Sequence, residues 1–149
     1  MKQFHLSIGV KSLKESAHFF EHVLGAKITY GDFTDFININ LFGNQLSLNK
    51  NPNINPNLVD FHFGINLPLK EFQNLEQDIS KHHSKWIHSP LTVVDEGTEM
   101  ERQKIDLKCP SGYLIQIKGY SNLRDIQNKK KVIEAADKFN KKEEIWVPN

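Results

Sequence analysis

The segment FHLSIGV at residues 4–10 decides the fold, because FHFGINL at residues 61–67 repeats its pattern. In both segments apolar residues alternate with polar or small ones, which is the period of a strand with one buried face. His5 and His62 occupy the second position of their copies, on the polar face. Such a repeat indicates a duplicated supersecondary unit. We therefore expect two similar modules whose opening strands bring His5 and His62 within a few ångströms of each other.

Composition narrows the class of protein. A chain of 149 residues is long enough for one domain with a core. The net charge of +1 indicates neither a nucleic-acid nor a membrane partner. The single cysteine, Cys109, excludes an internal disulfide and fits a reducing compartment. Neither a signal peptide nor a spanning helix is evident in the pattern, so we expect a cytoplasmic protein.

The first module, residues 1–50, reads as βαβββ. Ser12 and Glu15 form a capping box that begins a helix, and Gly25 ends it. Three alternating segments follow, at residues 27–30, 36–41 and 45–49. The pattern of this module therefore predicts one helix packed on the apolar face of a small sheet.

The second module, residues 60–120, repeats this plan after a linker rich in proline and asparagine at residues 50–59. Its predicted helix begins at Pro68. Its predicted strands cover residues 86–94, 102–108 and 113–118, the first of them an edge strand because of Pro90. The fold class is α+β, with a single domain over residues 1–120. Residues 121–149 read as a helical extension, and we interpret its run of three lysines as a solvated face.

The polar faces of the predicted strands carry the candidate site. Two histidines and one side-chain oxygen, that of Gln116, suit a first-row divalent metal. The alternative is a cup without metal, because a histidine on the polar face of a strand is most often only solvated. His18 and His22 on the first helix and the pair at residues 82–83 are weaker candidates.

The ordered features resemble a known family. FHLSIGV, a helix ending in FFEHVLG, and a Pro-Ser-Gly turn before the last strand resemble the vicinal oxygen chelate superfamily over residues 3–120. This superfamily includes glyoxalases, bleomycin resistance proteins and ring-cleaving dioxygenases. The resemblance implies paired βαβββ modules that form an open cup of mixed sheet, with the helices on the convex face. It also implies one divalent metal ion (Zn, Mn, Ni, Co or Fe) held by His5, His62 and Gln116.

Two departures from the family pattern bear on this metal. Family members commonly carry glutamate where this chain has Gln116, and Asp-Pro-x-Gly-Asn where it has CPSGY at residues 109–113. The change in the turn should leave the fold intact. The neutral Gln116 weakens the expected metal affinity and argues against ferrous oxygen chemistry, which commonly uses two histidines and a carboxylate. Some superfamily members do use glutamine as a ligand.

Two functions follow as hypotheses. The first is a metal-dependent enzyme, a lyase, isomerase or dioxygenase-like protein, whose small substrate chelates the ion through neighbouring oxygens. In this reading Asp106 or His88 serves as the base. The candidate substrate contacts are Arg102, Lys104, Asn38 and Ser47. The second is a metal-free protein that binds or sequesters a small molecule, as bleomycin resistance proteins do. Because the family's modules pair within or between chains, we also expect a homodimer.

Overall fold

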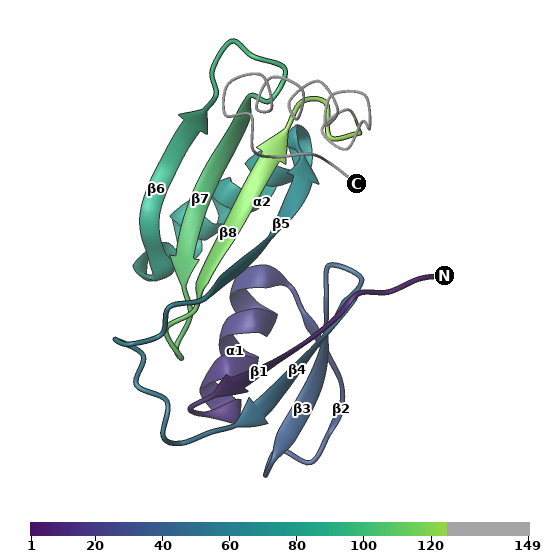
Figure 1. The fold of residues 1–149 in the computed structure, drawn as a ribbon, viewed down its shortest axis with the longest axis vertical. Coiled ribbons are helices and arrows are strands. Elements are labelled where there is room, and N and C mark those ends of the chain that lie inside the picture. The colour runs from purple at the N-terminus through teal and green to yellow at the C-terminus, as the bar shows by residue number, and fades with distance from the viewer. Residues whose placement is uncertain (125–149) are drawn as a thin grey trace, which may run out of the picture.

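The computed structural model describes residues 1–124, and these form two βαβββ modules of an α+β fold (Figure 1). The predicted fold class is therefore confirmed. Most of the predicted helical extension, from residue 125 onward, lies outside the described residues. No helix of residues 1–124 is long and apolar enough to cross a membrane.

The first module follows its predicted order. Its elements are β1 (His5–Val10), α1 (Leu13–Leu24), β2 (Lys27–Gly31), β3 (Phe36–Leu41) and β4 (Asn44–Lys50). The strands lie in the order β1-β4-β3-β2, with β1 parallel to β4 and the other pairs antiparallel. Helix α1 begins where predicted, because the Ser12 hydroxyl accepts a hydrogen bond from the backbone N–H of Glu15. It ends at Gly25, whose φ of 70° is the left-handed conformation that glycine adopts readily.

The second module has the same topology. Its elements are β5 (His62–Pro68), α2 (Leu69–His82), the short 3₁₀ helix η1 (Ser84–Trp86), β6 (Ile87–Val94), β7 (Arg102–Lys108) and β8 (Leu114–Tyr120). The strand order is β5-β8-β7-β6, with β5 parallel to β8. Pro68 caps α2 instead of entering it. Strand β6 lies at the edge of its sheet, as Pro90 predicted, and its pairing with β7 shifts register twice.

Each sheet buries its apolar face against its own helix. The largest fully buried side chains are Phe19, Phe20, Ile37, Ile39 and Leu48 in the first module and Phe72, Ile79, Ile105, Leu107, Ile115 and Ile117 in the second. The two cores meet where the ring of Phe19 packs edge-on against that of Trp86, with 5.0 Å between centroids. The opposite, polar face of each sheet is left free for a site.

The turn at residues 109–113 joins the modules. The Ser111 hydroxyl, fully buried, accepts a hydrogen bond of 2.9 Å from the backbone N–H of Lys11. The hydroxyl of Tyr113 donates one of 2.7 Å to the carbonyl oxygen of Gly9. Gly112 has a φ of 92°, and a Cβ there would lie 2.2 Å from the carbonyl oxygen of Pro56. The turn at residues 109–113 therefore connects β7 to β8 and also holds the second module against β1.

The eight strands form two four-stranded sheets, and within the described chain no ladder connects one sheet to the other. Strands β1 and β5 each lie at one edge of their sheet. An edge strand presents unpaired backbone N–H and C=O groups to whatever lies beside it. The opening strands that carry the two histidines therefore each have a free side, as do β2 and β6 at the other edges of the two sheets.

Gly119 sets how closely α2 approaches β8. A Cβ at this position would lie 2.5 Å from the Cβ of Phe72, which no side-chain rotation can relieve. We expect Gly119→Ala to lower the free energy of unfolding by about 1–3 kcal/mol, the usual range for an overpacked core. Urea denaturation measures this. Gln103→Ala, at the position paired with Gly119 on β7, is the control and should change stability by about 0.5 kcal/mol or less. Equal effects of the two changes would contradict this account.

Candidate functional site

The register of the second sheet aligns polar side chains in rows across three strands. One row joins Gly64 of β5, Gln116 of β8 and Asp106 of β7. The next row, two residues further along each strand, joins Asn66, Lys118 and Lys104. Because side chains two apart on a strand share a face, both rows lie on the same face as His62. The period-2 pattern gives the face of each residue, and the register then brings these residues together.

A hollow of about 310 Å³ lies on this face. His62, Gln116, Asn66 and Lys118 line it, together with Gly64 and its two neighbours in β5. A Cβ at Gly64 would come within 1.9 Å of the carbonyl oxygen of Gln116, so only glycine permits this approach. Two of the three predicted metal ligands, His62 and Gln116, therefore share one polar hollow.

His5 lies on the other sheet. It begins β1, is exposed, and pairs in register with Gln45 of β4. No contact between His5 and His62 is found among residues 1–124, nor any group of three or more His, Cys, Asp or Glu side chains suited to hold a metal ion. One chain thus supplies two of the predicted ligands at one place, and the meeting of His5 with His62 stays a prediction.

Asn38 and Ser47, two predicted substrate contacts, also lie on the first sheet. The Ser47 hydroxyl donates a hydrogen bond of 2.6 Å to Oδ1 of Asn38, directly across the β3–β4 pair. The equivalent pair in the second module is Gln116 and Asp106. The duplication thus places a hydrogen-bonded pair of neutral side chains in one module and an amide facing a carboxyl side chain in the other.

Asp106 does not line the hollow but is paired across the sheet with Gln116, which does. Only 7% of its surface is exposed, and one carboxylate oxygen, Oδ2, lies 3.5 Å from Nζ of Lys104. The other oxygen, Oδ1, is buried without a hydrogen-bond partner in the described part of the chain. Such an acceptor is costly to leave unsatisfied. Asp106 therefore has an oxygen free to accept a hydrogen bond or a proton beside Gln116.

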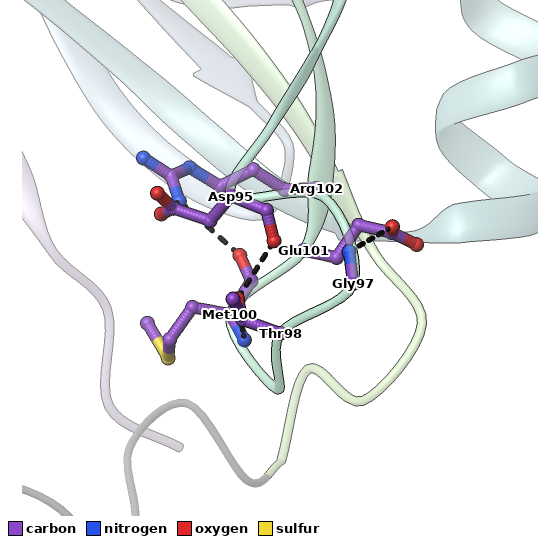
Figure 2. Close-up of polar contacts among 6 residues, drawn as sticks. All are labelled: Asp95, Gly97, Thr98, Met100, Glu101 and Arg102. Atoms are coloured by element: carbon purple, nitrogen blue, oxygen red, sulfur yellow. Dashed lines mark hydrogen bonds and ion pairs between the residues drawn. The ribbon is translucent and has the colours of Figure 1, made fainter.

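Arg102, predicted to contact substrate, is used within the loop between β6 and β7 (Figure 2). Its guanidinium Nη1 donates to Oδ2 of Asp95 and, at 3.2 Å, to the carbonyl oxygen of Met100. The guanidinium also lies over the ring of Tyr120, 5.9 Å from its centroid. Arg102 and His88, an exposed residue of the edge strand β6, are not among the residues that line the hollow. Their proposed roles at the site gain no support from this geometry.

Lys118 is the residue that sequence reasoning left unassigned. It is half-buried, lines the hollow, and stands directly across from Lys104 on β7. Its place on the polar face follows from the same alternation as that of Gln116, two residues before it. The signal was therefore present in the sequence, but the alternation does not show which lysine of the face lacks a carboxylate partner.

An apolar cavity of about 100 Å³ lies between the modules. Phe4 and Leu6 of the first module and Phe63, Ile65 and Ile115 of the second are among its lining residues. Leu6 of β1 and Phe63 and Ile65 of β5 alternate with the two histidines, so they point to the opposite faces of those strands. No titratable side chain lines this cavity, and it adjoins the polar hollow at β5, where residues 63–65 line both.

Cys109 and Tyr113 are buried at the turn between the modules. Burial raises the pKa of the Cys109 thiol above its usual range, and burial together with the nearby Cys109 raises the pKa of Tyr113. The folded state therefore holds these protons more tightly than the unfolded state does. For Cys109, this stability is complete below the unfolded pKa of about 8.5 and is lost as the pH rises through the raised pKa of the folded state.

This linkage predicts the alkaline stability of the protein. We expect the free energy of unfolding of the native protein to fall more steeply above about pH 8.5 than that of Cys109→Ala, because the variant has no buried thiol to ionise. Urea denaturation at a series of pH values measures both slopes. Parallel slopes for the two proteins would contradict the assignment.

Comparisons with known proteins address the fold. No family model matches the sequence, and no curated protein matches it. A solved glyoxalase/bleomycin resistance protein/dioxygenase from Alicyclobacillus acidocaldarius is 28% identical with a TM-score of 0.72, over 83% of this chain and 94% of that one.

Two more distant structures share the fold. A bleomycin-binding protein complexed with bleomycin is 18% identical, with a TM-score of 0.59, over 80% of this chain and 98% of that one. The fosfomycin resistance protein FosX from Listeria monocytogenes is 13% identical, with a TM-score of 0.62, over 80% and 93%. With its duplicated βαβββ modules, the chain shares the fold of the vicinal oxygen chelate superfamily, the structural group of glyoxalases, bleomycin resistance proteins and dioxygenases.

Proposed function

We propose that this chain is a divalent-metal-dependent enzyme acting on a small substrate that chelates the ion through two neighbouring oxygens. The observation that carries the proposal is the polar hollow of the second module, where His62 and Gln116 lie on one face. Imidazole nitrogen and amide oxygen are ligands that first-row divalent ions accept. The neighbouring Asp106 supplies an acceptor oxygen without a hydrogen-bond partner in the described chain.

The third ligand, His5, calls for a second copy of the chain in this proposal. Strands β1 and β5 are both edge strands, so β1 of one copy can lie beside β5 of the other. That arrangement would place His5 of one copy on the polar face next to His62 and Gln116 of the other. By twofold symmetry the same pairing occurs twice, which gives a homodimer with two equivalent sites.

The residues of the chain have distinct parts in this mechanism. When bound, the metal ion would polarise a substrate oxygen as a Lewis acid. Because His5, His62 and Gln116 are neutral donors, they would leave the charge of the ion available to stabilise negative charge on the substrate. Oδ1 of Asp106 would accept a proton from the substrate, since it is buried and has no competing hydrogen bond in the described chain.

A metal-free binding function is the second candidate. It is favoured by the neutral Gln116, whose amide contributes only a dipole where a carboxylate would add charge to a metal site. One protein of similar fold is described as a bleomycin-binding protein in complex with bleomycin. In this case the same hollow would hold a small molecule by hydrogen bonds and charge alone.

Elemental analysis separates the two candidates. The protein purified without chelators and incubated with zinc, manganese, nickel, cobalt or ferrous ions should retain one ion per chain after desalting. His62→Ala should retain none, because the proposed site then has only one histidine beside the amide oxygen of Gln116. If the native protein binds none of these ions, the metal-free candidate replaces the enzyme.

A further inference from the structure

We propose that Lys118, with Asn66 beside it, forms a subsite for an anionic oxygen group, so that the substrate of the hollow is a small oxyanion such as a phosphonate or a carboxylate. This inference rests on the proposed function only in placing the anion next to a metal-binding position. The subsite itself is built from charges, register and burial within the second module.

Lys118 belongs to a pair of like charges, only one of which is offset by a carboxylate. Lys104 and Lys118 stand directly opposite each other on neighbouring strands, an arrangement that destabilises a sheet. Asp106 offsets Lys104, with Oδ2 and Nζ 3.5 Å apart. Lys118 makes no ion pair with any described residue. A half-buried ammonium group of this kind is stabilised by an anion that reaches it from outside the chain.

The duplicated module provides an internal comparison. The row equivalent to Asn66, Lys118 and Lys104 in the first module consists of Gly9, Asn49 and Phe36, and it carries no charge. The same backbone therefore forms without lysines at these positions. The fold therefore does not require Lys104 and Lys118 to be charged, which points to a ligand as the reason for these charges.

Lys118 also lies close to the candidate metal ligands. Lys118 lines the same hollow as His62 and Gln116. It follows Gln116 by two residues on one face of β8, which separates their Cα atoms by about 7 Å. A small molecule can therefore place an anionic group at Lys118 and its chelating oxygens near Gln116. The exposed amide of Asn66 lies across from Lys118 and can donate a second hydrogen bond to the anion.

Anion binding can be tested without metal. The full chain in EDTA is titrated with inorganic phosphate and, separately, with acetate, using calorimetry at low ionic strength. We expect Lys118→Met, which keeps the length of the side chain and removes its charge, to weaken phosphate binding about tenfold or more, the usual consequence of losing a charged hydrogen bond. Comparing phosphate with acetate shows which class of oxyanion the subsite prefers.

Matched variants make the result specific. Lys81→Met removes an exposed lysine of α2 and should leave phosphate binding unchanged, which excludes an effect of net charge alone. Thermal unfolding confirms that each variant folds. The inference is overturned if Lys118→Met binds phosphate as tightly as the native protein, or if the native protein binds neither anion.

The same titration distinguishes this inference from the proposed function. His62→Ala should still bind phosphate, because the subsite uses Lys118 and Asn66. Phosphate binding that depends on Lys118, in a native protein that takes up no metal, would support the anion subsite and remove the metal-dependent enzyme. If the native protein takes up metal and Lys118→Met binds phosphate normally, the metal-dependent enzyme is supported and the anion subsite is removed.

Discussion

A mixture of His5→Ala and His62→Ala chains should recover metal sites that neither variant has alone. If each site combines His5 of one copy with His62 of the other, both homodimers lack a histidine at every site. In a mixed dimer, one site lacks both histidines and the other has both. With free exchange of subunits, half of the dimers are mixed, so about a quarter of the native metal content should return.

The experiment requires subunit exchange and a count of bound ions. The two variants are mixed, unfolded in urea and refolded together, and elemental analysis follows desalting. Light scattering must show dimers in each sample. His88→Ala is the matched control, because His88 is an exposed strand histidine that does not line the hollow, and it should retain the native metal content.

Each outcome of this experiment indicates a different arrangement of the metal site. No recovery in a mixture that light scattering shows to be dimeric would place each complete site within one chain. Full metal content in His5→Ala alone would remove His5 from the ligand set. A native protein that remains monomeric at high micromolar concentration would contradict the shared site directly.

The sequence predicted those parts of the fold that depend on local rules. The alternation of apolar and polar residues determined which side chains share a face, and His62 and Gln116, both expected on the polar face, line the same hollow. The capping residue Ser12 and the left-handed Gly25 marked the ends of α1 within a residue. Each of these features is decided by neighbours along the chain or along one strand.

The remaining features depend on contacts between distant segments, which local patterns do not encode. The two modules are held together by hydrogen bonds such as those from Lys11 to Ser111 and from Tyr113 to Gly9. Alternation put Arg102 on the polar face, but Asp95 in the preceding loop engages its guanidinium. The rows of charges across β5, β8 and β7 could be read only once the register was known.

Gln116→Glu should strengthen divalent metal binding by about tenfold or more, because the charge of the first ligand shell is a main determinant of affinity. The gain should shrink at low pH, since both histidines must be neutral to bind the ion. Calorimetric titration with zinc, cobalt and manganese measures the affinity of both proteins. Absence of metal binding by either protein would remove the enzyme and leave the metal-free binding protein.

Asp106 makes a second consequence of this substitution specific to the present chain. In Gln116→Glu the new carboxylate stands directly across from the buried Asp106, and two neighbouring carboxylates repel each other. We therefore expect the metal-free variant to be less stable than the native protein, and its melting temperature to rise more on addition of zinc, because the ion binds only the folded state. The double variant Gln116→Glu/Asp106→Asn separates the two effects: it should keep the tighter metal binding and recover the metal-free stability. A double variant that is less stable than Asp106→Asn by as much as Gln116→Glu is less stable than the native protein would show that Asp106 is not the source of the repulsion.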